Sequence, residues 1–141
     1  YRNIDTAQAY GNERGVGEGV RTADVPREEL FVSTKLAAEI KDYEGAVAAI
    51  DSSLATMGLD HIDLMLIHSP QPWDDFRGGD YAEGNRAAWR ALEEALAAGS
   101  GGKCALQTSG RVACLQPIAQ QRPALNPGEL RVGKRRRGFL G

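Results

Sequence analysis

The chain of 141 residues has the length of one ordinary domain, and its 42% apolar and 26% charged residues are typical of soluble globular proteins. No stretch approaches the roughly 20 consecutive apolar residues of a membrane span, and the first residues do not form a basic-then-apolar signal segment. We therefore expect a cytoplasmic protein with no membrane partner. Cys104 and Cys114 lack the paired short spacings of a zinc site, so we predict no metal.

The formal net charge of −2 hides an uneven distribution along the chain. Residues 1–99 contain nine Lys/Arg and eighteen Asp/Glu, whereas residues 100–141 contain eight Lys/Arg and one acidic residue, Glu129. Such asymmetry is typical of an interaction tail or of a segment with a different origin. We therefore predict a boundary at residue 99.

The first elements in the chain are a short strand, a helix and a second strand. The pattern predicts a strand at 1–5, followed by a loop, because Tyr-Gly-Asn punctuates the sequence there. Asn12 is a candidate N-cap for a helix at 13–22, and the charge of Glu13 suits the positive end of that helix. The apolar run that follows predicts a strand at 30–35.

Two more helices enclose a third strand. After Asp42, a second N-cap candidate, apolar residues recur at steps of four, three, four and three and predict a helix at 43–57 that ends at Gly58. Residues 62–68 are apolar almost throughout, as expected of a parallel strand covered on both faces. A helical spacing of Trp and Leu predicts the last helix at 83–98.

The order of strand and helix, repeated three times, predicts an α/β fold with a parallel sheet. Barrels and doubly wound sheets share this rhythm, so periodicity leaves both open. In either fold the functional residues lie at the carboxyl ends of the strands and in the loops that follow. Asp5, Lys35 and His68 fall at three such ends, and Tyr10 lies in the loop after the first. Each alone is typical of a solvated strand end, but three together indicate a site.

These four side chains suit one reaction. A phenol loses its proton only near pH ~10, which makes it a reluctant acid at neutral pH. A lysine ammonium beside the phenol favours the phenolate, and a carboxylate holds that ammonium in place. A histidine opposite can orient a carbonyl oxygen by hydrogen bonding. The set is therefore suited to protonating a carbonyl oxygen while a hydride reaches the carbon.

The same residues lie in motifs that resemble the aldo-keto reductase family, most of all its bacterial 2,5-diketo-gluconate reductase-like members. The order and spacing of the motifs are preserved through residue 99. The segments that carry the resemblance are Tyr1–Ala7, Tyr10–Glu13, Ser33–Lys35, Gly58–Leu64 and Ile67–Pro70.

The resemblance implies a (β/α)8 TIM barrel that reduces a small aldehyde or ketone with NADPH, in a family whose complete members are often monomeric. By resemblance Tyr10 is the general acid, Lys35 tunes it, Asp5 pairs with Lys35, and His68 positions the substrate carbonyl.

The sequence departs from the family pattern at the substrate walls. Many members have a tryptophan two residues after the catalytic lysine and another directly after the histidine, where this chain has Ala37 and Ser69. Trp73 is a candidate replacement for substrate binding. By resemblance, residues 1–99 cover strands two to four of the barrel with their helices, whereas a whole barrel needs about 250 residues.

The cofactor site is not assigned, because the family's main cofactor-binding segments follow later strands. The glycine run at 15–19 lies within a predicted helix and does not directly follow a strand, so we predict no phosphate site there. We expect an incomplete barrel that is inactive by itself.

Residues 100–141 hold seven Gly and three Pro without sustained periodicity, which predicts an irregular, disordered tail. If Gly102–Ser109 were read in the neighbouring frame, suitable codons would restore the family's Lys-Val-Arg and Ser-Asn-Phe, so a frameshift is one explanation. A real extension is the other: the basic run Lys134–Arg137 could bind nucleic acid or another partner in a non-catalytic fragment. Because no aromatic residues are interleaved with that run, we do not favour nucleic acid.

Overall fold

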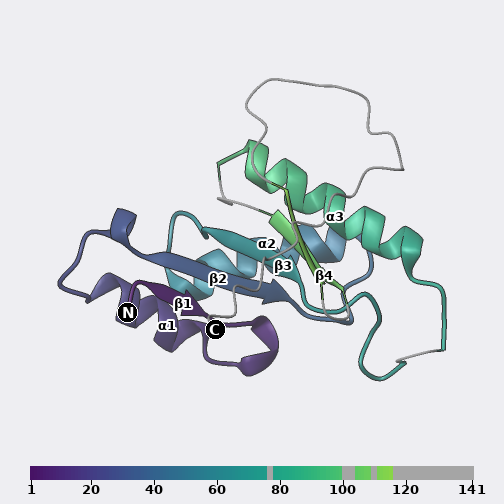
Figure 1. The fold of residues 1–141 in the computed structure, drawn as a ribbon, viewed down its shortest axis with the longest axis horizontal. Helices are drawn as coiled ribbons and strands as arrows, with labels where there is room; N and C mark the ends of the chain where they lie inside the picture. Colours follow the sequence, from purple (N-terminus) through teal and green to yellow (C-terminus); the bar gives the residue numbers. More distant parts are fainter. Residues whose placement is uncertain (76–77, 100–103, 109–110, 116–141) are drawn as a thin grey trace, which may run out of the picture.

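The structure is a computed structural model that describes residues 1–75, 78–99, 104–108 and 111–115, with side chains described as far as residue 99 (Figure 1). Strands and helices alternate along the chain. The strands are β1 (Asn3–Asp5), β2 (Phe31–Leu36), β3 (Leu64–Ile67), β4 (Cys104–Thr108) and β5 (Arg111–Leu115). The helices are α1 (Glu13–Arg21), α2 (Tyr43–Met57) and α3 (Ala82–Ala97), with 3-10 turns η1 (Gln8–Tyr10) and η2 (Arg27–Glu29).

The strands form one sheet in the order β1-β2-β3-β4-β5. The first three pairings are parallel, and β5 runs antiparallel to β4. Parallel strands that follow one another in chain order, without a reversal of direction across the sheet, form the wall of a barrel, whereas a doubly wound sheet has a switch point. The described strands therefore favour the barrel over the doubly wound sheet.

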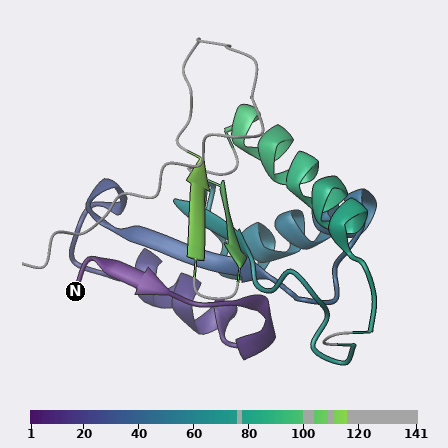
Figure 2. The same cartoon turned by 45° about the vertical axis from the view of Figure 1, so that its right-hand side comes forward.

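The three helices form one layer beside the sheet (Figures 1 and 2). Right-handed crossovers between neighbouring parallel strands place each connecting helix on the same face, and α2 packs against both α1 and α3. The helix bounds lie within a residue or two of those predicted from periodicity. Among the helices in the described part of the chain, none is long and apolar enough to cross a membrane.

Both predicted ends of α2 are confirmed. The side chain of Asp42 accepts a hydrogen bond from the backbone N–H of Gly45 at 2.6 Å, which satisfies a donor that the first turn leaves free. Gly58 ends the helix with φ of +62°, a left-handed conformation that costs glycine little.

Asn12 occupies the N-cap position of α1, as predicted, but the predicted capping bond of its side chain is wrong. The side chain of Asn12 makes no capping bond to α1; its Oδ1 instead accepts from the Thr6 hydroxyl at 2.5 Å. The loop from residue 6 to residue 12 bends back on itself, so Asn12 finds a nearer donor across the loop than along the helix. The side chain closes the loop that carries Tyr10.

Regular structure continues into the segment for which the sequence predicted none. β4 extends the parallel sheet, with Met65 opposite Cys104, and β5 returns beside it, with Cys104 opposite Leu115. The edge of β3 offers free backbone N–H and C=O groups, and a following segment can pair with them through its own backbone, whatever its side-chain pattern. For this reason side-chain periodicity did not reveal these strands. The run Lys134–Arg137 lies outside the described residues.

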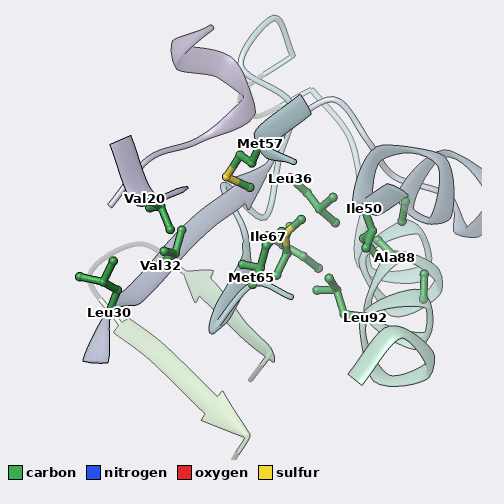
Figure 3. Packing of buried hydrophobic residues seen from close by; sticks show 13 residues of the cluster. Val20, Leu30, Val32, Leu36, Ile50, Met57, Met65, Ile67, Ala88 and Leu92 are labelled. Atoms are coloured by element: carbon green, nitrogen blue, oxygen red, sulfur yellow. The ribbon is translucent and has the colours of Figure 1, made fainter. Parts of the chain in front are cut away.

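The apolar core lies between the sheet and the helices (Figure 3). Because side chains alternate along a strand, Val32 and Leu36 of β2 face this core, whereas Ser33 and Lys35 point to the opposite face. The main core residues are Val20, Leu30, Val32, Leu36, Ile50, Met57, Met65, Ile67, Ala88 and Leu92. One strand thus supplies both the hydrophobic core and a polar face away from the helices.

Gly17 marks the closest contact between α1 and α2. A Cβ atom at Gly17 would overlap the backbone of Met57, whereas a Cβ at Gly19 would meet nothing within 4 Å. We expect Gly17→Ala to lower the free energy of unfolding by about 1–3 kcal/mol through overpacking. The matched change Gly19→Ala should raise it by about 0.5–1 kcal/mol, since alanine loses less backbone entropy in a helix. Urea unfolding followed by circular dichroism measures both, and an equal effect of the two changes would contradict this packing.

Candidate active site

An ion pair between a buried lysine and an exposed aspartate joins the carboxyl ends of β1 and β2. The Lys35 ammonium lies 2.7 Å from Asp5 Oδ2 and also donates to the backbone oxygen of Thr6 at 2.9 Å. The other oxygen of Asp5 accepts from the Ser33 hydroxyl at 2.9 Å. Parallel pairing places Asp5 directly opposite Ser33, so both partners of the carboxylate come from one strand.

The two members of the pair differ in exposure. The Lys35 side chain is only 8% exposed, whereas that of Asp5 is 58% exposed. An ammonium with so little access to water must be paired to stay charged. Asp5 and the Thr6 carbonyl provide that pairing, and they hold the charged end of Lys35 at the rim of the sheet.

Tyr10 lies at the end of the 3-10 turn η1, above this pair. The Lys35 ammonium is 5.2 Å from the centre of the Tyr10 ring, and the ring of His68 lies edge-on to it at a centroid distance of 5.8 Å. Tyr10 is 54% exposed, so its phenol is open to a ligand from solvent. The structure thus brings together all four residues predicted at the strand ends.

His68 follows β3 and continues its hydrogen-bond ladder. Its backbone N–H donates to the Leu36 carbonyl at 3.2 Å, which fixes the residue next to the end of β2. The Nδ1 atom of its ring is buried and makes no hydrogen bond with any described residue. Burial, and secondarily the positive charge of Lys35, lowers the pKa of His68, although Asp5 and Glu39 act in the opposite direction. The ring that lies beside Tyr10 therefore favours its neutral form.

Trp73 extends the row of rings along the rim. Its ring meets that of His68 edge-on at a centroid distance of 4.7 Å, and it is 49% exposed. Its backbone N–H donates to Glu39 Oε1 at 3.4 Å, from the loop after β2. Ser69, the residue directly after His68, offers little surface to a substrate. It is buried, and its hydroxyl accepts from the N–H of Gln71 at 3.3 Å.

Several polar residues around the site were not predicted from the sequence. Ser33 and Thr6 hold the ion pair, and Lys41 ties the loop after β2 to the segment after β3 by donating to the Ser69 carbonyl at 2.8 Å. Burial lowers the pKa of Lys41, whereas the nearby Glu39 raises it. The alternation of β2 could have revealed Ser33, which lies two residues before Lys35. The other contacts join segments far apart in the chain, so no local sequence pattern could reveal them.

A hollow of about 350 Å³ lies away from this site. It is bordered by the ends of α1 and α2 and by the segments that lead into the strands, at the end of the sheet opposite the rim. Arg21 and Arg27 border it, but both are engaged: Arg21 with the Met57 carbonyl, and Arg27 with Asp63 at 2.7 Å. Both arginines of this hollow are thus committed to contacts within the chain, whereas Tyr10 and Asp5 are exposed at the rim.

Comparison with known proteins gives one consistent result. The model of the aldo/keto reductase family matches residues 1–110, so the similarity continues beyond residue 99 and through β4. A glyoxal reductase of Bacillus subtilis is 44% identical over 94 residues, which cover 67% of this chain and 30% of that protein. An aldo-keto reductase of Mycolicibacterium smegmatis is 36% identical over 141 aligned residues, covering 93% of this chain and 47% of that protein.

A solved structure agrees with the sequence relatives. The crystal structure of a Bombyx mori aldo-keto reductase in complex with NADP superposes with a TM-score of 0.62 at 37% identity, over 75% of this chain and 36% of that chain. The chain therefore spans less than half the length of these relatives, and its four parallel strands are part of a TIM barrel.

The pKa of His68 can be measured directly. The sequence has two histidines, so His61→Gln leaves a single imidazole to follow by NMR. We expect His68 to take up a proton only below its ordinary pKa of 6.5, because burial and the Lys35 charge disfavour the imidazolium. Lys35→Met in the same background should raise this pKa by removing the positive charge. A pKa at or above 6.5 in the His61→Gln protein would contradict the environment described.

Proposed function

Because the chain belongs to the aldo/keto reductase family of oxidoreductases, we propose that it carries the proton-donating part of a site that reduces an aldehyde or ketone to an alcohol with NADPH. One observation supports this function above all. A buried ammonium, paired with a carboxylate, lies beneath an exposed phenol that faces a neutral histidine.

Tyr10 is the proposed general acid. Reduction of a carbonyl places negative charge on its oxygen, and that oxygen needs a proton before the alcohol can leave. The phenol of Tyr10 gives up this proton and becomes a phenolate, which the nearby Lys35 ammonium stabilises. Asp5 acts through Lys35, since it pairs with the ammonium and holds it in place.

His68 orients the substrate in this proposal. Its ring lies beside that of Tyr10, so both side chains can meet the carbonyl oxygen of one substrate. A neutral imidazole can donate one hydrogen bond to that oxygen without competing with Tyr10 as the acid. The lowered pKa of His68 thus fits an orienting role better than proton donation.

The residues at the rim fit a reaction with a nicotinamide cofactor. When bound, NADPH supplies the hydride that the carbonyl carbon receives, while the chain's own residues manage the proton. The exposed faces of Asp5 and Tyr10 are the described surfaces against which the nicotinamide end would lie. The NADP complex of the Bombyx mori relative supports the cofactor. The cytoplasmic location and the monomeric state stay predictions, and so does the alternative of a partner-binding basic tail, which lies outside the described residues.

A chimera tests the acid. The part of this chain that aligns with the Bacillus subtilis glyoxal reductase replaces its counterpart there, and oxidation of NADPH by glyoxal is followed at 340 nm. We expect turnover by the chimera, and a loss of roughly 100-fold or more in kcat for Tyr10→Phe, which keeps the ring and removes the proton.

Tyr43→Phe is the matched control, because that phenol lies on α2 and bonds to Glu94, away from the rim. It should keep kcat within about twofold. The 141-residue chain by itself should show negligible turnover. Hydride transfer needs the nicotinamide held about 3–3.5 Å from the carbonyl carbon, and this chain spans less than half the length of its relatives. An active chimera that is indifferent to Tyr10→Phe would refute the assignment of the acid.

Trp73 is proposed as a substrate wall beside His68. An exposed indole at this distance offers a flat apolar surface to a substrate whose carbonyl is bound at Tyr10 and His68. In the chimera we expect Trp73→Ala to lower kcat/KM for benzaldehyde by about 3–10-fold, the value of one aromatic contact. The value for glyoxal, which has no ring, should change less, and Trp73→Phe should retain most of the benzaldehyde rate. Equal losses for the two aldehydes would contradict this role.

A further inference from the structure

The position of Tyr10 is not set by its own side chain. Within the described residues, its hydroxyl makes no hydrogen bond, and its ring has an aromatic contact with His68 and a cation–π contact with Lys35. With 54% of the residue exposed, few packing contacts hold the ring. The backbone turn η1 must therefore fix where the phenol lies, and whatever holds that turn controls the distance from the phenol to Lys35 and His68.

The side chain of Gln8 holds this turn from below. Its Nε2 donates to the Ala49 carbonyl at 2.9 Å and to the Ser53 hydroxyl at 2.8 Å, both on α2. Its Oε1 accepts from the backbone N–H of Ala37 at 2.9 Å. Ala37 comes directly after β2, two residues beyond Lys35. One side chain thus joins the turn of Tyr10 to the strand end that carries Lys35.

The bonds of Gln8 belong to a larger buried network. Ser53 accepts from Gln8 and donates to Glu13 Oε2 at 3.2 Å, while Glu13 Oε1 accepts from the Thr34 hydroxyl at 2.7 Å. Ser53, Glu13 and Thr34 are 1%, 7% and 0% exposed. A network that is both buried and satisfied is rigid, because each broken bond would leave an unpaired polar group. The turn is therefore tied to α1, α2 and β2 at once.

The other end of the same loop is also fixed. Lys35 donates to the Thr6 carbonyl, and the Thr6 hydroxyl donates to Asn12. Gln8 lies between these anchors and is the described side chain that links the middle of the loop to the strand end beyond Lys35. Without it the loop would still close, but η1 could move toward solvent.

We propose that Gln8 is a positioning residue for the proton transfer, which places the Tyr10 phenol against Lys35 and His68 through its bonds to Ala37, Ala49 and Ser53. This inference rests on the proposed function of Tyr10. A displacement of about 1 Å of a reacting group can cost on the order of 100-fold in rate. The loss should appear in kcat, because Tyr10 acts in the chemical step, while substrate binding at Trp73 and His68 is retained.

The chimera described above provides the kinetic test. We expect Gln8→Ala to lower kcat by about 10–100-fold with KM within about threefold of the parent. Ser53→Ala removes one of the three hydrogen bonds of Gln8, and its kcat should lie between that of the parent and that of Gln8→Ala. Gln8→Glu keeps the acceptor for Ala37, and its protonated acid can donate again, so its kcat relative to the parent should rise as the pH falls from 8 to about 5.5.

Arg27→Met is the control for a loss of stability alone. Arg27 bonds to Asp63 and to the Leu30 and His61 carbonyls, at the end of the strands opposite the rim. We expect it to lower the unfolding midpoint without lowering kcat by more than about twofold. If Gln8→Ala leaves kcat within twofold, or if Arg27→Met lowers kcat equally, Gln8 is not a positioning residue. An inactive parent chimera, or one indifferent to Tyr10→Phe, would instead count against the proposed function.

A second measurement does not depend on activity. In the 141-residue chain, ring protons of Tyr10 and His68 should give a nuclear Overhauser contact, since the ring centres are 5.8 Å apart. Gln8→Ala should abolish that contact while the amide signals of α2 and β2 remain dispersed. A contact that persists in Gln8→Ala, or that is absent from the parent chain, would overturn the proposal.

Discussion

The burial of one ammonium constrains the whole site. Lys35 lies on β2, between β1 and β3, with almost no access to water, and a charge in that position is tolerated only when it is paired. Asp5 supplies the partner from β1, a strand of only three residues that has little backbone pairing of its own. The ion pair therefore helps to hold β1 beside β2. It also fixes the start of the loop that carries Tyr10, since the same ammonium binds the Thr6 carbonyl.

Local patterns were sufficient to predict the three helices, the first three strands, and the four side chains that meet at the rim. Helical spacing from Tyr43 to Met57 and the apolar run around β3 each report an interaction within a single element, so the sequence alone reveals them. The site followed from a rule of topology: the carboxyl ends of parallel strands meet at one rim, which made neighbours of Asp5, Lys35 and His68. The roles given to these residues are proposals, but their proximity is a finding.

Contacts that bridge distant segments were not predicted, and for a physical reason. Asn12 has the residue type of a cap, yet the hydroxyl of Thr6 competes for its side chain once the loop closes. Gln8 bonds to residues 29, 41 and 45 positions away, and no period in the sequence encodes such distances. The pairing of β4 with β3 is a backbone interaction, which side-chain patterns do not report.

Alternation along β2 explains how so small a unit can combine a core with a site. Val32 and Leu36 face the helices and pack in the core, whereas Ser33 and Lys35 face the other way and hold Asp5. Thr34 breaks the pattern, because it is polar on the helix-facing side, and its hydroxyl binds Glu13 within the network that reaches Gln8. Through this residue the helix layer is joined to the turn of Tyr10. The geometry of the rim therefore depends on how α1 and α2 pack beneath it, and the closeness of those helices at Gly17 belongs to the same constraint.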